Sequence, residues 1–152
     1  MAERTGSIRG VDEVNRTGRF LWAWVAFAFA LAIHVTDEAA HNFLSWYNPN
    51  VLAIRARFPF LPIPTFTFRQ WILGLAAAVV LLLCLSPFAS REARWLKLVA
   101  IPLGVIVGIL NGLQHLIVSV YLGRMAPGAL SGPILILAGG WLVLEARRKP
   151  EW

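Results

Sequence analysis

Residues 20–41 read FLWAWVAFAFALAIHVTDEAAH, an apolar run that ends in two histidines and two carboxylates. The first part, residues 20–33, is continuously apolar, as expected for a helix that is surrounded by lipid. On a helix, His34, Glu38 and His41 are spaced i, i+4 and i+7, so their side chains share one face. The stretch therefore predicts a membrane helix that carries a polar site near one end.

The composition of the whole chain also indicates a membrane protein. Of its 152 residues, 58% are hydrophobic and 14% are charged, and the mean hydropathy is +0.65. A soluble globule cannot expose so much apolar surface, whereas lipid sets no such limit. The net charge of +6 could suit nucleic acid, but the Lys and Arg residues lie almost entirely between apolar runs. We therefore expect a lipid bilayer as partner and no nucleic acid; a homo-oligomer stays open. The single cysteine, Cys84, excludes an intramolecular disulfide and a thiolate-cluster metal site.

The apolar segments predict an all-α fold, a four-helix transmembrane bundle. The expected spans cover residues 20–47, 71–86, 98–121 and 133–146. Residues 1–19 are expected to form a polar arm, flexible or lying on the membrane surface, and residues 20–149 the membrane domain. Asn48-Pro49-Asn50 is expected to end the first helix. Its apolar run has the length of a signal-peptide core, but no small-residue cleavage site follows, so we expect the helix to be retained.

Basic residues predict the orientation of these spans. Four spans place both termini on one side, and ten Lys or Arg residues fall in the segments of that side: Arg4, Arg9, Arg16, Arg19, Arg91, Arg94, Lys97, Arg147, Arg148 and Lys149. The opposite side has four: Arg55, Arg57, Arg69 and Arg124. The positive-inside rule then predicts cytoplasmic termini, and a bacterial cytoplasmic membrane is the expected location.

Polar residues inside the spans are the candidates for function, because an ionisable group at mid-bilayer costs about 2.5–3.5 kcal/mol on insertion scales. They are His34, Asp37, Glu38 and His41 on the first helix and Asn111, Gln114 and His115 on the third. At 1.5 Å per residue, His34 and His115 lie about 21 and about 25 Å from the starts of their helices, at similar depth. We therefore expect the two clusters to form one site.

A glycine series on the third helix supports close packing. Gly104, Gly108 and Gly112 repeat every four residues, and Asn111 and His115 continue the same face. Small residues let helices approach closely, so we expect the polar pair to face another helix rather than lipid.

These side chains suit a metal ion held by His34, Glu38, His41 and His115. Glu38-x-x-His41 has the spacing of carboxylate-bridged di-iron bundles, and imidazole with carboxylate suits zinc, iron or manganese. The third helix offers Asn111 and a histidine instead of a second Glu-x-x-His, which indicates one ion or none.

Other interpretations remain open at this point. In metal-free acid–base catalysis, Glu38 would exchange protons with His34 or His115 beside a small lipophilic substrate. Asp37 is a further catalytic candidate, and Asn111 and Gln114 are the candidates that would orient the substrate. A haem held by histidines of the two helices is less favoured, because carboxylates lie beside one ligand. In a non-enzymatic binding or accessory subunit, the same cluster would only fix helix packing.

The motif His34-Val-Thr-Asp37-Glu38 resembles the signature of the HXXEE family of small predicted membrane proteins, with Asp37 where the family has its first Glu. Asn111-x-x-x-His115 is similar to a later polar motif of that family, so the resemblance covers most of the chain. It implies a membrane enzyme without an established reaction. By fold-level analogy alone, the chain also resembles sterol-isomerase-like membrane bundles, which place His and Glu one turn apart in a lipid-facing cavity.

Overall fold

The computed structural model describes residues 4–148, and these form helices with no strand among them. In chain order the elements are α1 (Arg4–Ala40), α2 (Phe43–Arg57), α3 (Phe68–Cys84), α4 (Ser86–Ser90), α5 (Arg94–Pro102), the π-helix η1 (Leu103–Leu110), α6 (Asn111–Leu122) and α7 (Gly132–Arg147). The prediction of an all-α fold is confirmed.

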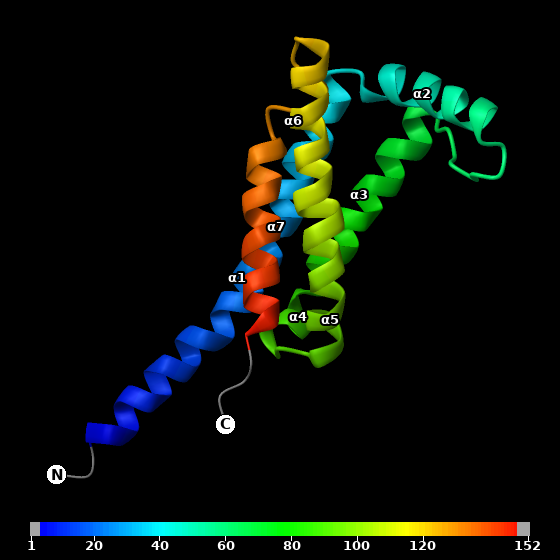
Figure 1. The fold of residues 1–152 in the computed structure, drawn as a ribbon. Coiled ribbons are helices and arrows are strands. Elements are labelled where there is room, and N and C mark those ends of the chain that lie inside the picture. Colours follow the sequence, from blue (N-terminus) through cyan, green and yellow to red (C-terminus); the bar gives the residue numbers. More distant parts are fainter. Residues whose placement is uncertain (1–3, 149–152) are drawn as a thin grey trace.

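Three rods make up the body of the molecule: α1, α7 and the continuous run α5–η1–α6, which pack side by side (Figure 1). α3 packs on α1, where the indole Nε1 of Trp24 donates a hydrogen bond to the carbonyl of Leu82 at 2.6 Å. α2 starts at the end of the bundle where α1 finishes and runs away from the three rods, beyond the upper end of α3 (Figure 1). At the opposite end, Arg19 of α1 lies 3.4 Å from the buried carboxylate of Glu145 on α7. The chain therefore enters and leaves the bundle at one end.

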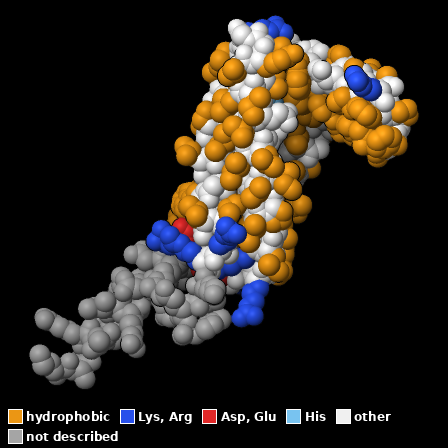
Figure 2. Space-filling view, viewed as in Figure 1, with side chains coloured by type: hydrophobic (Ala, Val, Ile, Leu, Met, Phe, Trp, Pro, Cys, Tyr) orange, Lys and Arg blue, Asp and Glu red, His pale blue; other side chains and the backbone are white. Residues whose placement is uncertain are grey.

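Three segments within the described residues are long and apolar enough to cross a membrane: Gly18–Ala40, Phe68–Ser90 and Arg94–Leu122. Large apolar side chains are exposed along their outer faces, as Trp22 at 64% and Leu73 at 58% illustrate. Figure 2 shows apolar side chains along the length of the visible face and Lys and Arg side chains at its ends. α7 has only 16 residues, so the fourth predicted span is a shorter helix packed against the others.

The first helix has different bounds from those predicted. α1 begins at Arg4, so the predicted polar arm is helical from that residue on; residues 1–3 lie outside the described part. It ends at Ala40 rather than at residue 47, because Asn42 adopts the left-handed conformation with φ of 54° and redirects the chain into α2. The prediction that Asn48-Pro49-Asn50 ends a helix is wrong. Pro49 lies inside α2, and the side chain of Asn48 instead bonds the backbone of Phe66 through both its amide nitrogen and its oxygen.

The glycine series packs against α7. An added Cβ would lie 2.7 Å from the Gly139 carbonyl oxygen at Gly104 and 2.6 Å from the Gly132 carbonyl oxygen at Gly112. The two backbones touch, as small-residue faces allow. The predicted close approach is therefore present, chiefly with α7; Gly108 also faces α1, where an added Cβ would lie 3.1 Å from a ring carbon of Phe27. Their effect on the site is indirect: they hold α6, which carries Asn111 and His115, at a fixed depth beside α7.

Candidate metal centre

Three side chains from two helices meet in the interior, and we call them the buried triad: His34 and Glu38 of α1 and His115 of α6. Their exposed fractions are 0%, 5% and 3%. One ligand atom from each lies within 4.8 Å of the others, an arrangement that could hold a metal ion. The Glu38 Oε1 atom lies 3.1 Å from His115 Nε2 and 3.7 Å from His34 Nε2. The two polar clusters were expected to form one site, and these three residues do lie together.

The other ring nitrogen of His34 is held by a chain of hydrogen bonds. His34 Nδ1 lies 2.9 Å from the hydroxyl of Ser131, and that hydroxyl donates to Asp37 Oδ2 at 2.7 Å. Because a hydroxyl has a single hydrogen, and Asp37 takes it, the Ser131 oxygen must accept from His34 Nδ1–H. We assign this tautomer on that ground. It leaves His34 Nε2 with a lone pair aimed at the triad, the form in which a histidine binds a metal.

Asp37 also fixes the loop between α6 and α7. Its Oδ2 accepts from the backbone N–H of Ser131 at 3.0 Å. Gly128 in this loop has φ of +82°, and a Cβ on it would lie 2.9 Å from both His115 Nδ1 and His34 Cε1. The loop backbone therefore lies against both imidazole rings, and glycine is required by conformation and by space. Sequence reasoning identified neither Ser131 nor Gly128 as part of the site.

His115 Nε2 is a buried nitrogen without a hydrogen-bond partner in residues 4–148; its 3.1 Å approach to Glu38 lacks hydrogen-bond geometry. The ring is wedged between others: it meets His34 edge-to-face at a centroid distance of 4.8 Å and Phe43 at 5.8 Å. Leaving a buried polar atom unpaired costs about 1–3 kcal/mol. A cation bound between Nε2 and the Glu38 carboxylate would remove that cost.

Asn111 also contacts the buried triad through a polar group. Its Nδ2 lies 3.2 Å from His34 Nε2, where the amide can donate to the lone pair left by the tautomer assigned above. The contact bridges α6 and α1. It also competes with a metal for the same lone pair, so an ion entering the triad must displace this amide.

Two predicted site residues lie apart from the triad. His41 is half exposed, and its Nδ1 lies 2.9 Å from Asp37 Oδ1, so it contacts the outer side of Asp37 and is not among the grouped ligands. The break after Ala40 explains this difference, because the i+7 spacing places two residues on one face only in a continuous helix. Gln114 is exposed on α6, away from the buried site. The direct contact of the two buried imidazoles leaves no space for a porphyrin between them.

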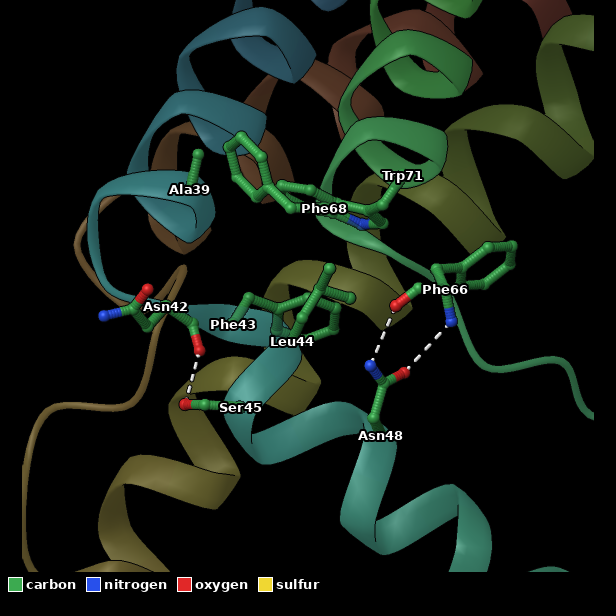
Figure 3. A pocket seen from close by; sticks show the side chains of 9 residues that line it. All are labelled: Ala39, Asn42, Phe43, Leu44, Ser45, Asn48, Phe66, Phe68 and Trp71. Atoms are coloured by element: carbon green, nitrogen blue, oxygen red, sulfur yellow. Dashed lines mark hydrogen bonds between the residues drawn. The ribbon is translucent and has the colours of Figure 1, made fainter.

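A cavity of about 380 Å³ opens beside the site, between the start of α2 and the start of α3 (Figure 3). Its lining includes Ala39, Phe43 and Trp71. Ala39 follows Glu38 in the chain, and the ring of Phe43 packs on His115. The cavity and the triad therefore share a wall.

Comparison with known proteins identifies one family. The family model described as "protein of unknown function with HXXEE motif" matches residues 24–142 of the chain. This range includes the buried triad and its hydrogen-bond partners. No curated protein and no solved structure matches the chain.

Proposed function

We propose that this chain, which belongs to the HXXEE family of proteins of unknown function, is an integral membrane enzyme with one intramembrane metal ion. The ion is held by the buried triad and acts on a small lipophilic substrate. One observation carries the proposal: three buried ligand atoms converge within 4.8 Å, and the ring of one ligand is oriented by a Ser–Asp chain.

The ligand set supports catalysis rather than a closed structural site. Structural zinc sites have four protein ligands, whereas catalytic sites have three and keep a position open for water or substrate. Two imidazoles and one carboxylate also suit iron(II) and manganese. A metal bound to such a set polarises a carbonyl oxygen or activates a bound water.

The proposed setting is a bacterial cytoplasmic membrane crossed four times, with both termini in the cytoplasm. The contact of Arg19 with Glu145 supports the proposal that both ends of the chain lie on the same side of the membrane. α7 would be about 24 Å long at 1.5 Å per residue, short for a hydrocarbon core of about 30 Å, and would cross inside the bundle. Alkaline phosphatase fused after residue 152 should be inactive, and fused after Arg124 active. The reverse pattern would refute the orientation.

Metal-free acid–base catalysis is the second candidate, favoured by the 3.1 Å approach of Glu38 Oε1 to His115 Nε2. A buried carboxylate and an imidazole at this distance can pass a proton to and from a substrate held beside them.

Metal analysis of the purified protein separates the two. Protein in detergent, stripped by chelation and titrated with Co²⁺, should bind about one equivalent and show visible d–d absorption. The variants His34→Ala, Glu38→Gln and His115→Ala should lose that absorption. His41→Ala and Gln114→Ala are matched controls and should keep it, because the structure places both side chains outside the triad.

Circular dichroism of each variant shows that loss of binding is not loss of fold. Equal Co²⁺ binding by all five variants would refute the ligand assignment. Folded wild-type protein that binds no metal would refute the metal proposal and leave the acid–base alternative. Added azide should shift the Co²⁺ absorption if a coordination position is open, and an unchanged spectrum would refute a catalytic role for the ion.

A further inference from the structure

Two neighbouring cavities lie between α2 and α3. The cavity of about 380 Å³ beside the triad shares Phe43, Phe66 and Trp71 with a second one of about 310 Å³. The second continues down α3 to Gly74 and Leu75. Because the two share walls, we treat them as one crevice. Each is within the size range of small-molecule sites, about 300–1,000 Å³.

The crevice has one polar end and one apolar end. Near the α1–α2 turn its lining includes Asn42 and Ser45, and the Ser45 hydroxyl donates to the Asn42 carbonyl (Figure 3). Towards Gly74 and Leu75 the lining is almost wholly apolar. Within residues 4–148, none of the side chains that line either cavity is charged. An ionic ligand would find no counter-ion there, and burying its charge unpaired would be costly.

Aromatic rings form the walls of the crevice. Phe43 and Tyr47 stack at 5.3 Å with an angle of 29° between their planes, and Tyr47 and Phe66 at 6.1 Å and 25°. Hydrogen bonds fix these walls: the Tyr47 hydroxyl donates to the Pro64 carbonyl, and Asn48 bonds the backbone of Phe66. Nearly parallel, anchored rings suit an extended or flat apolar body.

We infer that this crevice binds an uncharged amphiphile. Its apolar body lies along α3 against the stacked rings of Phe43, Tyr47 and Phe66, and its single hydroxyl or carbonyl head lies at the α1–α2 turn near Asn42 and Ser45. The ring of Phe43 lines the crevice and packs on His115, so the crevice and the triad lie on either side of this ring. The binding rests on the crevice alone; the role of the ligand as substrate rests on the proposed function.

Glycine positions offer a matched pair of test variants. A Cβ at Gly74 would meet nothing within 4 Å, so Gly74→Phe is free of a clash at Cβ and places a ring at the apolar end. Gly140 on α7 has the same open surroundings and does not line the crevice, so Gly140→Phe is the control.

The probe is 1-decanol carrying a diazirine on its chain, photolysed with the protein in phosphatidylcholine nanodiscs and mapped by peptide mass spectrometry. Labelling should concentrate on residues 42–48 and 66–75. Excess 1-decanol should suppress it at least five-fold more than decanoate or decylamine at the same concentration. Gly74→Phe should lower it at least five-fold and Gly140→Phe should leave it unchanged. Labelling spread evenly over lipid-facing residues, or equal in the two variants, would overturn the inference.

Glu38→Gln separates this inference from the proposed function. Glu38 does not line the crevice, so labelling of this variant should equal that of the wild type even if no metal is bound. In Co²⁺-loaded wild type, 1-decanol should shift the d–d absorption, and in Gly74→Phe it should not. Labelling without any such shift would leave the crevice as a ligand site and refute its role in supplying the triad.

Discussion

Replacement of Ser131 by alanine tests whether the triad is built for a metal. The Ser131 hydroxyl accepts from His34 Nδ1–H at 2.9 Å and donates to Asp37 at 2.7 Å, and the ring of His34 is fully buried. Ser131→Ala leaves Nδ1–H unpaired, which costs about 1–3 kcal/mol. The metal-free ring can avoid this cost by moving its proton to Nε2, whereas the metal-bound ring cannot, so Co²⁺ affinity should fall by up to about 150-fold, at about 1.4 kcal/mol for each factor of ten. Outer partners of metal-bound histidines typically contribute about 10- to 100-fold.

The assay is a competitive Co²⁺ titration against a chromophoric chelator, with ¹⁵N chemical shifts of His34 as a second readout. Ser131→Ala should weaken binding and mix the two ring tautomers, and Ser131→Thr, which keeps the hydroxyl, should recover most of both. Ser90→Ala is the control, because its hydroxyl bonds only the Pro87 carbonyl among the described residues, at the far end of the bundle. Wild-type affinity in Ser131→Ala would refute the orienting role. Equal loss of affinity and thermal stability in Ser90→Ala would show a nonspecific effect.

Four further predictions use the same preparations. Gly128→Ala should abolish Co²⁺ binding, because its Cβ would meet both imidazoles, whereas Gly123→Ala, also at positive φ but in open space, should keep it in the same titration. Gly139→Ala should lower the thermal unfolding midpoint by several degrees, because its Cβ would lie 2.6 Å from a carbonyl oxygen of η1, and Gly140→Ala should not; equal midpoints would contradict the packing. Co²⁺ affinity should fall as the pH is lowered, because protons compete with the ion for the ligand atoms, and an affinity that stays constant down to the pH at which the protein unfolds would contradict the ligand set. Asn111→Ala should raise Co²⁺ affinity about fivefold in the same titration, because it frees the His34 Nε2 lone pair that the ion needs.

Much of the fold followed from hydropathy, which reports directly on what lipid tolerates. The segments around residues 18–40, 68–90 and 94–122 are apolar over lengths that only membrane helices need, so their existence was predictable. The residues at which these helices begin and end were harder to predict. Asn42 interrupts the first helix by adopting a left-handed conformation, and Pro49 is accommodated inside α2. Both outcomes depend on tertiary contacts, such as the Asn48 bonds to Phe66, which no local pattern contains.

The site was predictable where helix geometry alone decided it. His34 and Glu38 share a face of α1 because they are one helical turn apart. His115 lies beside them because it is at a similar distance from the start of its own membrane helix. His41 lies outside the triad, because the i+7 spacing rule assumed an unbroken helix and α1 ends at Ala40. Ser131 could not be predicted, because its contact with His34 spans 97 residues and depends on how the loop before α7 folds back.

The variant Asn111→Ala distinguishes the metal interpretation from the packing interpretation, because only the metal interpretation predicts a rise in Co²⁺ affinity. As a packing element, its 3.2 Å contact with His34 Nε2 stabilises the α1–α6 contact, and its removal only weakens the fold. As a neighbour of a metal site, the same hydrogen bond holds the lone pair that the ion needs. A net hydrogen bond contributes about 0.5–1.5 kcal/mol, so releasing the lone pair should tighten Co²⁺ binding several-fold while thermal stability of the metal-free protein falls. Affinity that falls along with stability would mean that the amide supports the ion through its oxygen or through packing. Only the combination of tighter binding and lower apo-stability shows that the ion takes the place of Asn111 on His34.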